Sequence, residues 1–324
     1  MGEQGHLYFH SPCFDGIASA VLVSDFLETA RGMAPLVLHP VDYDLRAGWL
    51  ALELGAPAAV VDFLYHPRAA FWADHHATAF LNDEARADFD RRSGPAVIYD
   101  GAADSCAGLL WRHLEQAFGH RDARYADLVG WAEKIDAARY GSVEEAIFGS
   151  APALRLALGL ALGDGAGHCV RLVRALREHT LDEVGELADV RQRFEEGRAL
   201  HHAGLERFKR GAVLDEDDIV TFDVDGDGVI VSRYAPYYFH PAARYSIGIV
   251  RSRGGAKITA MRNPWREFAS VPLGRILEAV GGGGHHRVGA VALPPERVAE
   301  ARAVLVRVLA EVRRRQEALD RGEG

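Results

Sequence analysis

The sequence lacks the features that mark disulfide-rich secreted proteins and membrane-spanning proteins. Only three cysteines occur in 324 residues, at the widely separated positions Cys13, Cys106 and Cys169. They are too few for a disulfide framework, which is typical of a protein from a reducing compartment. No run of about eighteen apolar residues is present, so no membrane-spanning helix is predicted. The first ten residues do not form the basic and then apolar segment of a signal peptide, and we expect a cytoplasmic protein without a membrane partner.

Positive charge is also in deficit. The chain has 37 Lys and Arg residues against 46 Asp and Glu residues, a formal net charge of −9. A protein that coats nucleic acid non-specifically needs a broadly basic surface, so this class is excluded. Hydrophobic residues make up 48% of the chain, which is long enough to bury two separate cores.

The first half of the chain alternates short apolar runs with helical patterns. Strands are predicted at "LYF", "LVLHPVDY", "AAVVDF", "AAFWADHH" and "PAVIYD", and a helix is predicted over 17–29. Strands separated by helix-sized segments indicate an α/β domain, with a mainly parallel sheet and helices on both faces. In such sheets, functional side chains gather at the carboxyl ends of the strands.

The second half begins with helical patterns and then returns to strands. We predict several helices from about residue 104, ending in a long charged helix over 181–209 that links two domains. Beyond it, "IVTFDVDGDGVIVSRY" and "YSIGIVRSRGGAKITAMR" each predict a β-hairpin, and a terminal helix follows. The predicted organisation is a first domain over 1–180, a linker helix over 181–210 and a smaller α+β domain over 211–324.

Residues of metal-ligand type occur in four separate segments of the first domain. They are His10 with Asp15 in "HSPCFDG", Asp62 in "VVDF", the "ADHH" segment, and Asp136 in "AEKID". Three of these segments follow predicted neighbouring strands, so their carboxylates emerge from a buried edge, where an unpaired charge is costly. Carboxylates mixed with imidazoles suit Mn²⁺, Mg²⁺ or Zn²⁺ in a hydrolytic site better than a structural zinc ion.

A glycine-rich segment, "AVGGGGHHRVGA", lies far downstream. Glycines at 281–284 precede His285, and glycine lets backbone amides approach a phosphate closely. From 231 to 290 the sequence has seven more basic than acidic residues, which favours an anionic ligand for this region. The basic residues are 233, 244, 251, 253, 257, 262, 266, 275 and 287, and the acidic residues are 267 and 278.

Together these motifs resemble the DHH phosphoesterases, and specifically the subgroup with a DHH-associated C-terminal domain that includes RecJ-like and oligoribonuclease-like enzymes. The matching segments are "HSPCFDGIASA", "VVDF", "ADHH", "AEKID" and "AVGGGGHHRVGA". They cover roughly 6–140 and 211–292. DHH after a strand, combined with a strand-end Asp and a downstream GGGH segment, is a specific pattern.

The resemblance implies one or two divalent ions, usually Mn²⁺, with Mg²⁺ or Co²⁺ as alternatives. His10 would bind one ion, a second set of ligands would bind the other, and Asp62 would bridge them. This second set consists of Asp15, His75 and Asp136. The resemblance assigns catalytic roles to two further residues: Asp74 would orient its neighbouring histidine, and His76 would contact the scissile phosphate.

The resemblance also assigns substrate binding to the glycine-rich segment and to two arginines. These residues are Gly282, Gly283, Gly284, His285, Arg262 and Arg287. Arg262 is expected to act as a bidentate phosphate clamp. The expected substrate is a short single-stranded oligonucleotide or a small nucleotide, and a homodimer is left open.

The expected activity is a metal-dependent phosphodiesterase or exonuclease, but Cys13 departs from the family pattern. The family usually has a further Asp at this position, two residues before Asp15. This departure leaves open a nucleotide-binding protein with weakened catalysis. An exopolyphosphatase-like hydrolase is a separate alternative. Cys13 itself is a candidate metal ligand.

Overall fold

The computed structural model describes residues 4–92, 94–163 and 165–322. The chain divides into two compact units. The first contains Met1–Arg139 and Ser150–Glu195, and the second contains Tyr140–Gly149 and Glu196–Gly324. The boundary between Glu195 and Glu196 falls inside the long helix α9 (Ala188–Gly211).

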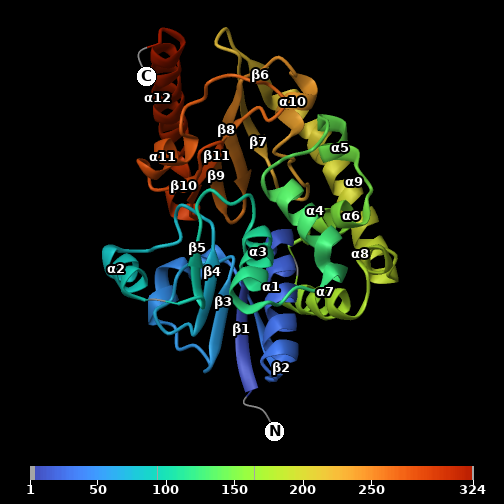
Figure 1. The fold of residues 1–324 in the computed structure, drawn as a ribbon. Coiled ribbons are helices and arrows are strands. Elements are labelled where there is room, and N and C mark those ends of the chain that lie inside the picture. The colour runs from blue at the N-terminus through green and yellow to red at the C-terminus, as the bar shows by residue number, and fades with distance from the viewer. Residues whose placement is uncertain (1–3, 93, 164, 323–324) are drawn as a thin grey trace. The chain divides into compact units, whose positions relative to one another are not determined.

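The first unit is built on a five-stranded parallel sheet with strand order β2-β1-β3-β4-β5 (Figure 1). All five strands were predicted from the sequence. Their bounds are β1 (Gln4–His10), β2 (Ala34–Val41), β3 (Ala58–Val61), β4 (Phe71–Asp74) and β5 (Val97–Tyr99).

Both faces of this sheet are buried, as the unbroken apolar runs in its central strands indicate. Leu7 and Phe9 of β1 belong to one core, which is shared with α1 (Phe14–Asp25) and the neighbouring helices. The intervening Tyr8 belongs to a second core, which contains Trp49 and Trp72. This alternation follows from the two-residue period of a strand.

The helices of the first unit lie mostly on the face of α1, whereas the opposite face is covered by the 3₁₀-helix Tyr43–Ala51, α2 and intervening loops. The predicted helix over 17–29 begins three residues earlier, at Phe14, and ends in a π-helical turn, Phe26–Ala30. The helices are α1 (Phe14–Asp25), α2 (Asp83–Arg91), α3 (Cys106–Phe118), α4 (Ala126–Asp136), α6 (Pro152–Leu160), α7 (Ala166–Glu178) and α8 (Leu181–Gly185), with a further 3₁₀ turn at Ala123–Tyr125.

The second unit contains a mixed six-stranded sheet with strand order β10-β11-β9-β8-β7-β6. Its core lies between one face of the sheet and two helices, α11 and α12, where Ile247 and Ile258 pack with Leu277 and Val308. The strands are β6 (Ala212–Leu214), β7 (Ile219–Asp225), β8 (Tyr245–Ser252), β9 (Gly255–Arg262), β10 (Gly283–His285) and β11 (Val288–Leu293). The helices are α5 (Val143–Phe148), α9, α10 (Ala235–Phe239), α11 (Leu273–Glu278) and α12 (Ala301–Asp320), with a 3₁₀ turn at Pro295–Glu300.

Two predicted elements differ from the structure. The helix predicted over 181–209 is two helices, because α8 ends at Gly185 and α9 begins at Ala188. The hairpin predicted at 219–234 is wrong: after β7 the chain turns at 226–228 but forms no second strand. Its backbone bonds elsewhere, since the N–H of Ile230 donates to the carbonyl of Leu200, and β7 instead pairs in parallel with β8. The hairpin predicted from 245 to 262 is confirmed by the antiparallel β8–β9 pair.

Within the described residues, no helix has the length and apolar character needed to span a membrane.

Candidate metal centre

Asp15 lies in the first turn of α1, directly after the end of β1. A Cβ on the next residue, Gly16, would lie 2.0 Å from the carbonyl oxygen of His10, so only glycine allows this close approach. The Asp15 carboxylate is buried and accepts hydrogen bonds from the backbone amides of Cys106 (2.7 Å) and Ala107 (2.9 Å), at the start of α3. These bonds fix the carboxylate at the carboxyl edge of the sheet.

Burial and the charge of Asp136 raise the pKa of Asp15, whereas His75 and the two backbone amides lower it. A nearby cation would favour the charged form of such a carboxylate.

Asp62 follows β3 in a strained backbone conformation. Its φ angle is +55°, which is uncommon for a residue other than glycine and is often found at functional sites. The side chain is fully buried, and its Oδ2 lies 3.3 Å from Nδ1 of His10. The other oxygen, Oδ1, has no hydrogen-bond partner among the described residues. Burial raises the pKa of Asp62 well above its usual value, and the charges of Asp15 and Cys13 raise it further.

His75 is surrounded by carboxylates. Its Nε2 lies 3.6 Å from Oδ2 of Asp15, 3.7 Å from Oδ1 of Asp62 and 3.5 Å from Oδ2 of Asp136. Its Nδ1 lies 3.0 Å from the carbonyl oxygen of Ala103. Because a carbonyl oxygen only accepts, Nδ1 carries the proton, and in the tautomer that binds a metal the Nε2 lone pair would face the carboxylates. Lone pairs that converge in this way are the donor set of a divalent cation, so these residues fit one.

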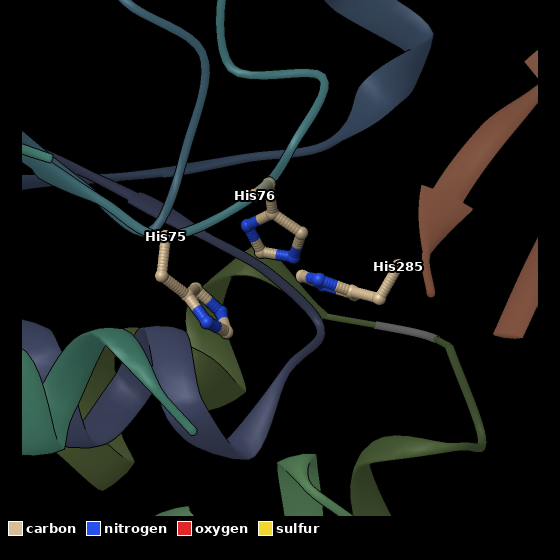
Figure 2. Close-up of side chains that lie close together, drawn as sticks. All are labelled: His75, His76 and His285. Atoms are coloured by element: carbon tan, nitrogen blue, oxygen red, sulfur yellow. The ribbon is translucent and has the colours of Figure 1, made fainter. Parts of the chain in front are cut away.

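Asp74, the last residue of β4, holds the histidine that follows His75. Its Oδ1 lies 2.8 Å from Nδ1 of His76 and also accepts the backbone N–H of His75. Both histidines project from the segment after β4 (Figure 2), and their ring centroids are 4.5 Å apart. Burial alone lowers the pKa of His76, but the charge and hydrogen bond of Asp74 raise it to about 9. His76 is therefore a cation at neutral pH in the metal-free protein.

The predicted ligands fall into overlapping groups whose ligand atoms lie within 4.8 Å of one another. One group is Asp15, His75 and Asp136, and another is His10, Cys13 and Asp62. A third joins Asp62, Asp74, His75 and His76. All the residues predicted as metal ligands in the first unit thus lie close together; their assignment to particular ions remains a prediction.

Cys13 lies at the N-terminus of α1, where burial and the charges of Asp136 and Asp15 raise its pKa to about 12. The sequence did not point to Tyr43, although its ring is edge-on to His10 at 5.0 Å between centroids. Burial and the charges of Asp74 and Asp62 raise the pKa of Tyr43 well above its usual value. The only signal for Tyr43 in the sequence was its place at the end of the predicted strand "LVLHPVDY".

The glycine-rich segment lies in the second unit, at the edge strand β10. Gly281 and Gly284 have φ angles of +90° and +142°, which favour glycine. A Cβ on Gly284 would lie 2.3 Å from the carbonyl oxygen of Val288. Gly282, Gly283 and His285 complete the segment, and its role in substrate binding remains a prediction.

Arg262 lies at the end of β9 and is mostly buried. Its terminal nitrogens donate to the carbonyls of Asn263 and Phe268, both at 3.1 Å, and its guanidinium stacks on the Phe268 ring. Its backbone N–H donates to the carbonyl of Arg287. These bonds order the loop after β9, and the phosphate-clamp role of Arg262 remains a prediction.

The basic excess inferred for 231–290 is largely neutralised by acidic residues, most of them outside that window. Five of its arginines form ion pairs in the second unit. The pairs are Arg244 with Asp320, Arg251 with Asp223, Arg253 with Asp227, Arg266 with Asp218 and Arg275 with Glu278. The charge count along the sequence therefore overstated the attraction of this region for an anion.

No protein-family model matches the sequence, and no curated protein matches it. Several solved structures match the fold. The pGpG-specific phosphodiesterase PggH from Vibrio cholerae is 18% identical, with a TM-score of 0.65 over 95% of this chain and 99% of its own. RecJ from Thermus thermophilus, solved with Mn²⁺, is 16% identical, with a TM-score of 0.59 over 97% of this chain. This chain spans about half of that RecJ, since 52% of it is covered.

A third structure, described as the DHH domain of a member of a ribosomal protein family, is 13% identical. Its TM-score is 0.63, over 96% of this chain and 87% of its own. These matches and the motifs agree on one architecture: the chain has the fold of the DHH phosphoesterases.

Proposed function

We propose that this protein is a divalent-metal-dependent phosphoesterase that hydrolyses short oligonucleotides or small nucleotides. The observation that carries the proposal is the surroundings of His75, where carboxylates from three separate segments converge on Nε2 at 3.5–3.7 Å. Structures with this fold include a phosphodiesterase of pGpG and the exonuclease RecJ with manganese bound, which supports both the reaction and a divalent ion, with Mn²⁺ as the first choice.

The metal would be held by His10, Asp15, Asp62, His75 and Asp136. A divalent ion bound there lowers the pKa of a water molecule and neutralises charge on the phosphate oxygens. Asp62 is placed to face both ligand groups, since Oδ2 lies near His10 and Oδ1 lies near His75.

His76 supplies a positive charge next to these ligands. Asp74 fixes its ring through Nδ1, and in the proposed reaction Nε2 would donate a hydrogen bond to a phosphate oxygen. A donor that is held in place before the reaction stabilises developing charge at little reorganisation cost. Asp74 acts through His76 and is a positioning residue.

The test is hydrolysis of pApA, short RNA and bis-p-nitrophenyl phosphate with Mn²⁺, Mg²⁺ or Co²⁺, compared with the chelated protein. We expect metal-dependent cleavage by the wild type and its loss in Asp62→Asn. A matched control is Asp90→Asn, which removes a half-exposed carboxylate on α2. Cleavage that survives chelation or the Asp62 substitution would refute the proposal.

A second candidate function is nucleotide binding with weak catalysis, favoured by Cys13 next to His10 and Asp62. Tight binding of nucleotides without metal-dependent turnover would support it. Cleavage of polyphosphate or pyrophosphate alone would instead support an exopolyphosphatase-like activity.

A further inference from the structure

The sheet of the second unit has a hollow on the face opposite α11 and α12. Alternate residues of β8, β9 and β11 pack into the core with these helices, and the intervening residues point to the other face. The hollow on that face has a volume of about 490 Å³. This volume falls within the range of sites for small organic ligands.

Small side chains make this face hollow. Thr259 of β9 lies opposite Ala290 of β11, and Lys257 lies opposite Ala292. Such side chains leave space above the sheet that larger residues would fill, and the exposed backbone and methyl groups offer a flat apolar floor.

One wall of the hollow is the segment that the sequence predicted as the turn and second strand of a β-hairpin. Residues 226–233 leave the sheet after β7, and Val229, Val231 and Arg233 line the hollow. Glycine is required at 204, because a Cβ there would lie 2.0 Å from the carbonyl oxygen of Ile230. This close contact holds the wall against α9.

The hollow suits an anion that also carries an apolar or planar group. Among the described residues, its lining includes the cations Arg233 and Lys257 but no Asp or Glu. Hydroxyl groups of Ser232, Ser252 and Thr259 add hydrogen-bonding capacity. A phosphate next to a nucleobase or ribose has this combination of charge, flat apolar surface and hydrogen-bonding groups.

The register of the sheet places this hollow beside the glycine-rich segment. His285 of β10 lies opposite Val288 of β11, and Val288 lies opposite Met261 of β9. Directly opposed residues of antiparallel strands point to the same face. His285 therefore shares the face of the hollow, whose lining begins at Val288 and Met261. Lys257 and Ala292 lie four residues further along, about 13 Å at the rise of a strand.

We propose that this hollow, the sheet groove, binds the second nucleotide of a short oligonucleotide whose terminal nucleotide is held at the glycine-rich segment. This inference rests on the proposed function for the class of its ligand. The sheet floor contacts the base or ribose, and Lys257 pairs with a phosphate. The groove thereby selects substrates of two or more nucleotides over mononucleotides and inorganic polyphosphates.

The test measures binding of pApA and AMP by calorimetry, in EDTA, so that the result does not depend on turnover. Lys257→Gln removes the cation, and Ala290→Phe fills the groove. We expect each to weaken pApA binding by about tenfold while AMP binding changes by less than about threefold. The matched control is Arg253→Gln in the β8–β9 turn, whose side chain is 94% exposed and is not part of the groove lining. It should bind pApA within about twofold of the wild type.

Both Lys257 and Arg253 are exposed, so their substitutions do not threaten folding, and thermal unfolding checks Ala290→Phe. Wild-type affinity for pApA in both groove variants, or no pApA binding by the wild type, would contradict the proposal that the groove binds a nucleotide. Hydrolysis assays separate the two proposals. If pApA binds through the groove but no metal supports its cleavage, the phosphoesterase proposal is wrong and the groove-binding proposal is supported. If cleavage occurs but the groove variants bind pApA normally, only the groove-binding proposal is wrong.

Discussion

Nδ1 of His75 lies 3.0 Å from the carbonyl oxygen of Ala103, and this contact orients the ring toward the carboxylates. The tautomer that it selects leaves the Nε2 lone pair facing Asp15, Asp62 and Asp136. A backbone carbonyl often takes this role behind a histidine that binds a metal. The metal-ligand role proposed for His75 thus depends on an atom outside the predicted ligand set.

Replacing His75 or Asp62 by alanine should abolish metal-supported activity. His75 and Asp62 each belong to more than one of the groups of predicted ligands. Because either change removes a shared ligand, we expect the affinity for Mn²⁺ to fall by at least about 100-fold. Calorimetric titration of the metal-free variants with Mn²⁺ measures the loss separately from turnover. The site assignment is wrong if both variants keep wild-type affinity and rate.

Cys13→Asp should raise the affinity for Mn²⁺ at the ion near His10. The substitution replaces a soft, high-pKa thiol by a hard carboxylate, which Mn²⁺ prefers. Titration of both proteins with Mn²⁺ tests this, and a thiolate-to-metal absorption band with Co²⁺ in the wild type alone would identify sulfur as a ligand. Identical titrations and no such band would place Cys13 outside the cluster.

The first sheet, and the proximity of the residues predicted as metal ligands, were predictable because local pattern and buried environment agree. Apolar runs identified all five strands, and strand ends located Asp62 and Asp74. The contact from Ala103 was not predictable, since every residue carries the same carbonyl and only the fold selects one. The amides of Cys106 and Ala107 that bind Asp15 escaped prediction for the same reason.

Sequence pattern misled where tertiary contacts override it. The apolar stretch from Val229 to Val231 has the composition of a strand, but its backbone bonds to α9 and its side chains form a groove wall. Charge counting failed similarly around Arg251, because Asp223, which neutralises it, lies 28 residues earlier in the sequence.

Asp74→Asn should lower the pKa of His76 from about 9 in the metal-free protein. Asparagine keeps an oxygen that can accept the backbone N–H of His75, but it removes the negative charge that stabilises the imidazolium. An NMR titration of the histidine ring protons in EDTA measures the shift. We also expect the variant to lose activity at neutral pH and to regain it at lower pH, where His76 is again protonated. An unchanged pKa of His76 would show that Asp74 does not set the charge of His76.

Asp320→Asn should destabilise the docking of α12 at neutral pH and less so in acid. Both oxygens of Asp320 accept from the Arg244 guanidinium, at 2.8 and 2.7 Å. Hydrogen bonds from Arg244 and then Gln316 lower the pKa of Asp320 to about 2. A depressed carboxylate pKa stabilises the folded state above the unfolded-state value near 3.9, and this contribution is lost as the pH falls through about 2.

Because the side chain of Asp320 is 49% exposed, solvent screening keeps the expected loss small, at about 0.5–1 kcal/mol at pH 7. Denaturant unfolding at pH 7 and at pH 3 measures this loss. The difference in the free energy of unfolding between variant and wild type should be smaller at pH 3 than at pH 7. The control is Glu317→Gln one turn earlier, whose ion pair with Arg321 is longer, at 3.9 Å, and more exposed. Equal effects of the two substitutions at pH 7 would mean that the bidentate geometry of Arg244 adds nothing to the stability of the second unit.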